Sequence, residues 1–262
     1  MKGILLFAFN TNTVDYYSMA IATAKRANHF LNLPVSVVTD NSINPDDYEY
    51  KFDNLYVVEP DRSNVKGKSV WINKGRYQAY DLTPYDDTIV LDTDYLINSN
   101  KLIEVFELNQ DFICPNSTHF LFHPENHQEQ ISPTAYNTLW ATVIGFKKTN
   151  STKQLFNCIK MVQENYSHYA YLYNMHTAMF RNDYALTIAH RIINGHYEDK
   201  SNYMPWRLVH AGSDITISKV TESEFNTEYI MFRKNSKDKN EYIMVKDTDF
   251  HCMNKTTFME IV

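Results

Sequence analysis

Short apolar runs alternate with longer amphipathic stretches over the first hundred residues of this chain. Four runs read as buried strands because they are short, β-prone and nearly continuous in apolar side chains: Ile4–Phe9, Val35–Thr39, Leu55–Val58 and Thr88–Leu91. Between the first two runs, apolar residues recur at helical spacing from Val14 to Leu31, and Thr13 is placed to cap that helix. Residues 72–82 also read as helical, ending before Pro84. This alternation predicts an α/β fold with a mostly parallel central sheet flanked by helices.

The second half of the chain is more mixed. Asn137–Phe146 predicts a strand, and two amphipathic stretches predict helices, Ser151–Asn165 and Asp183–Asn194. Two similar β-prone runs, Glu228–Arg233 and Glu241–Lys246, flank the polar loop N-S-K-D-K-N and predict a C-terminal β-hairpin. Because no long linker or low-complexity segment interrupts the pattern, we expect residues 1–262 to form a single domain.

Polar residues stand where the predicted strands end. Asn10 and Thr11 follow the first strand, Asp40 follows the second, and Asp92-Thr93-Asp94 follows the run T-I-V-L. The carboxyl ends of parallel strands share one edge of a sheet, where ligands bind. In an extended chain alternate residues point the same way, so the carboxylates of Asp92 and Asp94 repel each other unless a cation lies between them. A divalent cation with oxygen ligands is the preferred explanation, and an Asx-type turn is the alternative.

Composition narrows the classes of function. Six glycines in 262 residues, none in a G-x-G-x-x-G or G-x-x-x-x-G-K motif, disfavour a glycine-rich phosphate loop, so phosphates would be bound by a metal and cationic side chains. The net charge of -6 argues against a protein that coats nucleic acid. The chain carries no long apolar segment, no signal-peptide pattern and only three widely spaced cysteines, so we expect a cytoplasmic protein without a membrane partner.

The sequence V-L-D-T-D-Y resembles the D-x-D motif that nucleotide-sugar-dependent glycosyltransferases of the GT-A fold carry after an apolar strand. Upstream, N-K-G-R-Y-Q-A-Y resembles their helix with a cationic residue, here Lys74 or Arg76, and W-A-T-V-I-G-F-K-K-T resembles a strand that lines the sugar site. Near the C-terminus, D-F-H-C-M-N-K resembles an H-x-x-G-x-K-like element, in which His251 and Lys255 take part. The chain departs from that element by having Met-Asn where a glycine is expected.

The resemblance implies a GT-A-like catalytic domain whose residues 1–100 bind the nucleotide and whose residues 101–262 serve the acceptor. Mn²⁺ or Mg²⁺ would be held by Asp92, Asp94 and His251. The residues implied to surround the rest of the donor are Phe9, Asn10, Thr11, Asp40, Lys74, Arg76 and Lys255. Asp183 is the candidate catalytic carboxylate on the sugar or acceptor side, and helix capping explains it equally well. Whether His251 or the second D-T-D, Asp247 and Asp249, completes the metal site stays open.

The function expected from this resemblance is metal-dependent transfer of a sugar from a nucleotide sugar, a UDP-sugar being preferred, to a hydroxyl acceptor on a glycan, a protein or a DNA base. Hydroxymethylated bases of phage DNA are the named alternative acceptor, with Lys147, Lys148 and the lysines of residues 234–239 as phosphate contacts. A sugar nucleotidyltransferase is a further alternative, although F-A-F-N-T-N-T lacks the glycine-rich loop that it requires. A non-catalytic nucleotide-sugar-binding module is the third.

Overall fold

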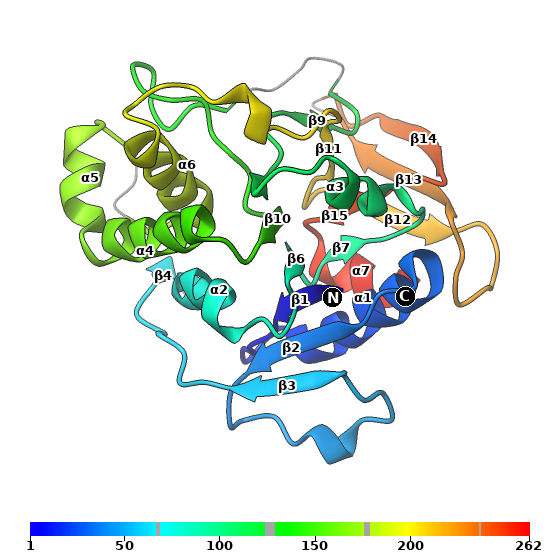
Figure 1. The fold of residues 1–262 in the computed structure, drawn as a ribbon. Helices are drawn as coiled ribbons and strands as arrows, with labels where there is room; N and C mark the ends of the chain where they lie inside the picture. Colours follow the sequence, from blue (N-terminus) through cyan, green and yellow to red (C-terminus); the bar gives the residue numbers. More distant parts are fainter. Residues whose placement is uncertain (67–68, 124–128, 176–178, 236) are drawn as a thin grey trace.

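A six-stranded sheet forms the centre of the protein in a computed structural model that describes residues 1–66, 69–123, 129–175, 179–235 and 237–262. Its strand order is β3-β2-β1-β6-β10-β8 (Figure 1). The strands are β1 (Lys2–Phe7), β2 (Val35–Thr39), β3 (Asn54–Val57), β6 (Asp87–Leu91), β8 (Phe112–Ile113) and β10 (Val143–Lys147). Strands β3, β2, β1 and β6 are parallel, and β10 is antiparallel to both of its neighbours. The predicted α/β fold with a mostly parallel sheet is confirmed.

Both faces of the central sheet are buried, which explains why its strands are continuous apolar runs rather than alternating ones. Ile4 and Leu6 of β1 pack with helix α1 (Tyr16–Leu31) on one face. Leu5 and Phe7 pack on the other face with helices α4 (Asn150–Glu164) and α6 (Asn182–Ile193). Full burial of one such side chain contributes roughly 1.5–3 kcal/mol. Because alternate residues of β1 face opposite sides, this one strand stabilises the packing of helices on both faces of the sheet.

Two predicted elements differ from the structure near the carboxyl edge of the sheet. Residues 72–82 form a 3₁₀ turn, η2 (Lys74–Gln78), and a short helix, α2 (Ala79–Leu82), instead of one helix. The strand predicted from Asn137 begins only at Val143. Upstream of it the backbone bonds to distant segments: Leu139 N donates to Thr187 Oγ1, and Trp140 N donates to Pro115 O. The capping prediction also shifts, since the carboxylate of Asp15 accepts the α1 amide of Ser18.

A second, four-stranded sheet has the order β7-β15-β11-β9 and consists of β7 (Tyr95–Leu96), β15 (Phe250–Cys252), β11 (Leu208–Ala211) and β9 (Thr118–Phe120). Strand β7 directly follows the aspartate pair and is antiparallel to β15, with His251 opposite Tyr95. This pairing brings the end of the chain to the carboxyl edge of the central sheet.

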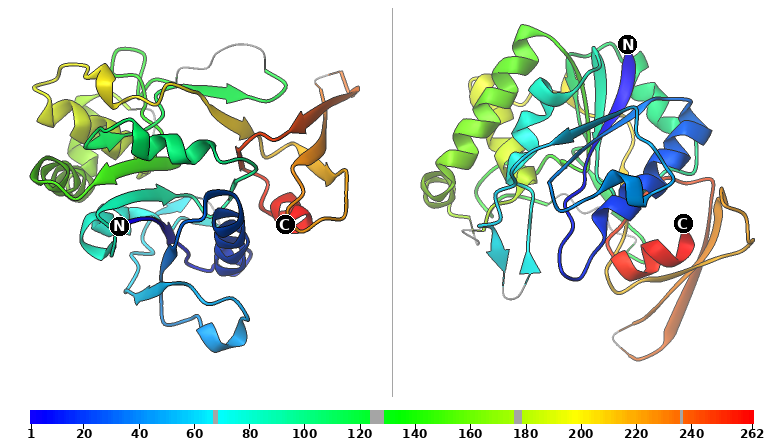
Figure 2. Two further views of the ribbon diagram at one scale, coloured as in Figure 1. Left: turned by 45° about the vertical axis from the view of Figure 1, so that its right-hand side comes forward. Right: turned by 90° about the horizontal axis from the view of Figure 1, so that it is seen from below.

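The predicted C-terminal hairpin is present as β13 (Glu228–Lys234) and β14 (Asn240–Lys246), joined by β12 (Thr216–Lys219) in a three-stranded sheet that projects from the body of the protein (Figure 2). Ser236 of its loop lies outside the described residues. The remaining elements are β4 (Val65–Lys66), β5 (Ser69–Val70), α3 (Glu104–Glu107), α5 (Tyr166–Leu172), α7 (Lys255–Ile261), η1 (Pro45–Asp47), η3 (Lys101–Ile103) and η4 (Lys200–Asn202). Among the described helices, none has the length and apolar character to cross a membrane.

Candidate metal and nucleotide-sugar site

The aspartate pair forms the turn between β6 and β7. Asp92 N donates to Thr142 O at 3.0 Å, and Thr23 Oγ1 of α1 donates to Thr93 O at 2.7 Å, so neighbouring elements hold the turn on both sides. The carboxylate of Asp92 bonds to Arg76, and that of Asp94 bonds to His251. In an Asx turn the carboxylate would instead bond to the backbone of a residue close by in the sequence.

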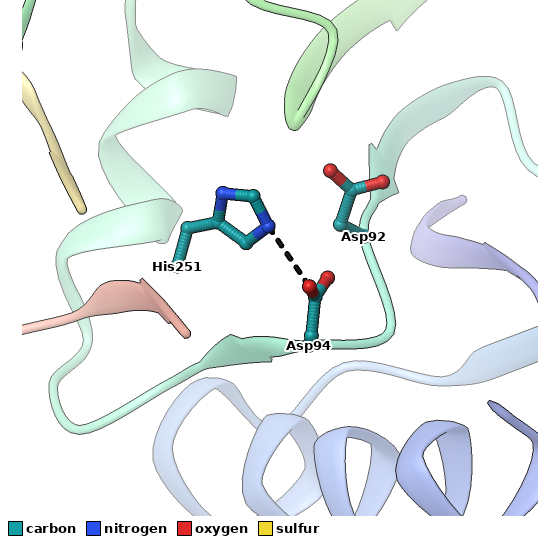
Figure 3. Close-up of side chains that lie close together, drawn as sticks. All are labelled: Asp92, Asp94 and His251. Atoms are coloured by element: carbon teal, nitrogen blue, oxygen red, sulfur yellow. Dashed lines mark hydrogen bonds and ion pairs between the residues drawn. The ribbon is translucent and has the colours of Figure 1, made fainter. Parts of the chain in front are cut away.

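Asp92, Asp94 and His251 form a three-residue cluster whose ligand atoms all lie within 4.8 Å of one another (Figure 3). His251 Nε2 is 2.9 Å from Asp94 Oδ2. The side chains are 18%, 6% and 13% exposed, respectively, so the cluster is largely withdrawn from water. Two carboxylates and an imidazole are a donor set that suits Mn²⁺, and the carboxylates alone suit Mg²⁺. The residues therefore fit a divalent cation.

Two cationic side chains flank this cluster. The guanidinium of Arg76 pairs with Asp92 and also donates to Ala141 O at 3.1 Å. The ammonium of Lys255, at the start of α7, pairs with the same Asp94 oxygen that faces His251. Two carboxylates and two cations balance, so the site is close to neutral before any ligand binds.

The local charges shift the protonation equilibria in consistent directions. Burial alone would raise the pKa of the Asp92 carboxyl, but the positive charges of Arg76 and Lys255 hold that pKa below its ordinary value. Burial lowers the pKa of the Lys255 ammonium to about 8, against the opposing effect of Asp92. Burial also lowers the pKa of His251, which keeps the imidazole neutral at pH 7 and able to present a lone pair.

The cluster lies in a cavity of about 670 Å³, a volume within the range of small-molecule sites. Its wall combines aromatic, charged and amide side chains from the edges of both sheets. In addition to the cluster, its lining includes Phe9, Thr11, Trp71, Arg76, Glu129, Trp140, Arg181, Asp183, His210 and Lys255.

Asp183 enters the cavity from the first turn of α6. Its Oδ1 accepts the amide of Ala141 at 2.9 Å, and its Oδ2 lies 3.3 Å from Arg181 Nη2. Arg181 also pairs with Glu129 at 2.6 Å. Although burial opposes it, the charges of Asp183 and Glu129 raise the pKa of Arg181. Asp183 thus fastens the loop before β10 to α6, and its catalytic role stays a prediction.

The structure brings together only part of the predicted nucleotide site. Phe9 and Thr11 line the cavity, whereas Asn10, Asp40 and Lys74 are not among the described residues that line it. The amide group of Asn10 bonds to the start of α1, accepting from Tyr17 N at 2.9 Å. The carboxylate of Asp40 pairs with Arg62 at 2.5 Å, and the ammonium of Lys74 pairs with Asp61 at 3.2 Å. Their role in donor binding stays a prediction.

The second D-T-D lies in the turn between β14 and β15. Asp247 accepts from Thr227 Oγ1 at 2.6 Å, and Asp249 accepts from Asn98 N at 2.7 Å. Neither belongs to the described lining of the cavity or to the three-residue cluster. Of the two candidates for completing the cluster, the structure places His251 beside Asp94.

No pattern in the sequence indicated Glu129, Arg181 or His210 as residues of this cavity, whereas Trp140 begins the run that was expected to line the sugar site. His210 is 1% exposed and lies opposite His251 in the register of β11 and β15. Burial lowers the pKa of His210 to about 2, so its ring is neutral. A lone histidine in the apolar run L-V-H-A carries no sequence signal that separates it from an ordinary core residue.

No protein-family model and no curated protein matches this chain. Solved structures with a similar fold include the glycosyltransferase GlyE of Streptococcus pneumoniae TIGR4, with 13% identity, a TM-score of 0.42 and coverage of 78% of this chain but 44% of GlyE. Mouse xyloside xylosyltransferase 1 aligns with 10% identity over 78% of this chain and 84% of its own, with a TM-score of 0.47. The galactosyltransferase LgtC, solved with donor and acceptor sugar analogs, aligns with 13% identity over 72% of this chain and 70% of its own, also at 0.47. These similarities concern the fold alone.

Proposed function

We propose that this chain is a glycosyltransferase that binds a nucleotide sugar through Mn²⁺ or Mg²⁺ and transfers the sugar to a hydroxyl group. The observation that carries the proposal is the convergence of the ligand atoms of Asp92, Asp94 and His251 within 4.8 Å, although 157 residues separate Asp94 from His251, in a cavity of about 670 Å³. A UDP-sugar is the proposed donor, on the strength of the resemblance of V-L-D-T-D-Y to the D-x-D motif.

The charges of the site support an anionic ligand that arrives together with a cation. Asp92 and Asp94 are balanced by Arg76 and Lys255, and His251 is neutral at pH 7. A bound divalent cation therefore leaves the site with a net positive charge. A diphosphate is the matching partner, because its oxygens complete the shell of such a cation and accept hydrogen bonds from lysine and arginine.

In this reaction the metal supplies Lewis-acid stabilisation of the negative charge that develops on the departing nucleoside diphosphate. The residues of the chain perform the remaining tasks. Arg76 and Lys255 place fixed positive charge beside the diphosphate, where partial exclusion of water strengthens their effect. Phe9 and Thr11 at the end of β1 are proposed to contact the nucleoside.

Asp183 is proposed to face the transferred sugar or the acceptor. One of its oxygens accepts the amide of Ala141 and the other pairs with Arg181. Because a carboxylate accepts roughly four hydrogen bonds, each oxygen keeps the capacity to bind a sugar hydroxyl. Its two present partners hold the carboxylate in place before the substrate arrives, which favours precise orientation.

The acceptor is proposed to be a hydroxyl of a glycan or a protein rather than a DNA base. The ammonium of Lys147 donates to Asn109 Oδ1 at 2.6 Å, and that of Lys148 donates to Thr83 O at 2.7 Å. Lys234 pairs with Asp238 at 3.0 Å. Three of the five lysines that were the sequence candidates for DNA phosphates thus already have partners in the protein.

The test is release of the nucleoside diphosphate from a panel of UDP- and GDP-sugars, with Mn²⁺ and with EDTA. Asp94→Asn removes a charge of the cluster, and Asp247→Asn is the matched control because it makes the same change in the second D-T-D. Asn also tolerates the positive φ of 47° at that position. We expect metal-dependent turnover that Asp94→Asn abolishes and Asp247→Asn leaves intact. Failure to turn over or bind any nucleotide sugar refutes the proposal.

A further inference from the structure

The closest polar neighbour of His251 on its far side is a second histidine. Strands β11 and β15 are parallel, and their register sets His210 opposite His251. The Nδ1 atoms of the two rings are 2.9 Å apart, and the rings meet edge to face at 64°. The Nε2 atom of His251 points the other way, to Asp94 (Figure 3).

A hydrogen bond between two neutral imidazoles requires complementary tautomers, because one nitrogen must donate and the other must accept. While His251 Nε2–H donates to Asp94, its Nδ1 accepts from His210 Nδ1–H. A cation can bind His251 Nε2 only through its lone pair, which requires the proton on His251 Nδ1. In that state His251 donates to His210 Nδ1, and His210 carries its own proton on Nε2. Both states keep the bond and the same net charge.

Apart from its contact with His251, the ring of His210 packs against aromatic side chains. Its ring stacks on Phe120, with centroids 4.9 Å apart and planes at 17°, and lies 4.9 Å from Trp140. Its Nε2 atom is buried without a hydrogen-bond partner among the described residues. Burying an imidazole nitrogen without a partner is unfavourable, so a hydrophobic residue would suit this aromatic box better. The bond to His251 is the polar interaction that accounts for a histidine at this position.

We propose that His210 is a positioning residue for the metal site: through Nδ1 it fixes the ring orientation of His251 and admits the tautomer whose Nε2 binds a divalent cation. This inference rests on the proposed function, because it assigns a supporting partner to one of the three ligands proposed there. Loss of such a supporting hydrogen bond typically weakens metal binding by about 10–100-fold.

The first experiment measures Mn²⁺ affinity from the electron paramagnetic resonance signal of the free ion, with and without UDP. His210→Phe keeps an aromatic ring in the box but removes the hydrogen bond, and we expect it to weaken Mn²⁺ binding by about 10–100-fold. His210→Asn places an amide where Nδ1 stands, so we expect it to recover most of the affinity. His190→Phe is the matched control, because His190 is equally buried but belongs to α6 outside the cluster. It should bind Mn²⁺ like the wild type.

A second readout follows the tautomers by ¹⁵N NMR of the histidines in the wild-type protein, with diamagnetic Zn²⁺, a cation that imidazole binds. Saturation with Zn²⁺ should move the proton of His251 to Nδ1 and that of His210 to Nε2 together. This readout stands even where His210→Phe does not fold. Wild-type affinity in folded His210→Phe, combined with loss of binding in Asp94→Asn, overturns the inference and leaves the proposed function intact. Absence of metal binding by the wild type, with or without UDP, overturns both.

Discussion

Replacing Asp249 with Asn should stabilise the protein at neutral pH, and the structure gives the size of the effect. Asp249 is 8% exposed, and its Oδ2 has no hydrogen-bond partner among the described residues. Burial raises the pKa of its carboxyl from 3.8 to about 6, against smaller opposing effects of the bonds from Asn98 and Ser99. Because one pKa unit corresponds to about 1.36 kcal/mol, ionisation of Asp249 destabilises the folded state by about 3 kcal/mol.

The sign follows from where the proton binds. The folded state holds the proton of Asp249 more tightly than the unfolded chain does. The contribution of this group to the free energy of unfolding is therefore most favourable to the folded state below pH 4, and it is lost as the pH rises through about 6. Asn mimics the protonated carboxyl and does not titrate. The difference in stability between Asp249→Asn and the wild type should therefore grow from near zero at pH 4 to about 3 kcal/mol at pH 7.

Urea unfolding of both proteins at pH 4, 5, 6 and 7 measures this difference, and titrations common to the two proteins cancel in it. The matched control is Asp247→Asn, two residues away, where an exposed carboxylate is replaced. Its stability relative to the wild type should hardly vary with pH. A difference for Asp249→Asn that stays constant from pH 4 to 7 would contradict this expectation, because it would mean that the carboxyl titrates alike in the folded and unfolded states.

Three further outcomes are expected. Arg76→Lys, which cannot bond both Asp92 and Ala141 O with a planar fork, should lower steady-state turnover of the nucleotide sugar by about 10²-fold or more, and unchanged turnover would contradict its role. Arg26→Met should lower the free energy of urea unfolding by about 3 kcal/mol, since it removes the side-chain donor to Ile97 O and leaves one hydroxyl, that of Tyr229, to serve both Asn98 Oδ1 and Asn226 O. Mn²⁺ at 100 times its Kd should stabilise the wild type by about 2.7 kcal/mol in thermal unfolding, and Asp94→Asn should show no such gain.

The fold was predictable where burial alone decides the local structure. The run Val35–Thr39 forms β2 with the predicted bounds, because a short, continuously apolar stretch between two sheet layers has few alternatives. The prediction of a strand from Asn137 failed because hydrogen bonds to distant side chains replace those of a β-ladder there. The amides of Leu139 and Ala141 bond to side chains of α6 instead of to a neighbouring strand. Propensity along the chain contains no information about those distant acceptors.

The same distinction applies to the residues of the site. Asp92 and Asp94 were predictable because both lie at one strand end, two residues apart, where repulsion must be relieved locally. His251 came from the pattern of a late segment that also contains Lys255. Three other side chains reach the cavity only through tertiary contacts: Glu129 and Arg181 pair with each other, and His210 lies opposite His251 in the sheet. The sequence around them contains no motif that indicates a site.

The geometry of the site also explains why its ligands come from two sheets. Asp92 directly follows β6 of the central sheet, Asp94 directly precedes β7 of the second sheet, and His251 belongs to β15 of the second sheet. The amide of Cys252 donates to Asp94 O at 2.9 Å, so the backbone of β15 is bonded to the aspartate turn itself. Pairing of β7 with β15 therefore sets His251 beside Asp94, and Asp92 completes the cluster from the end of β6, across the junction of the two sheets. Because a cation bound to all three bridges that junction, metal binding and docking of the sheets must favour each other by linkage.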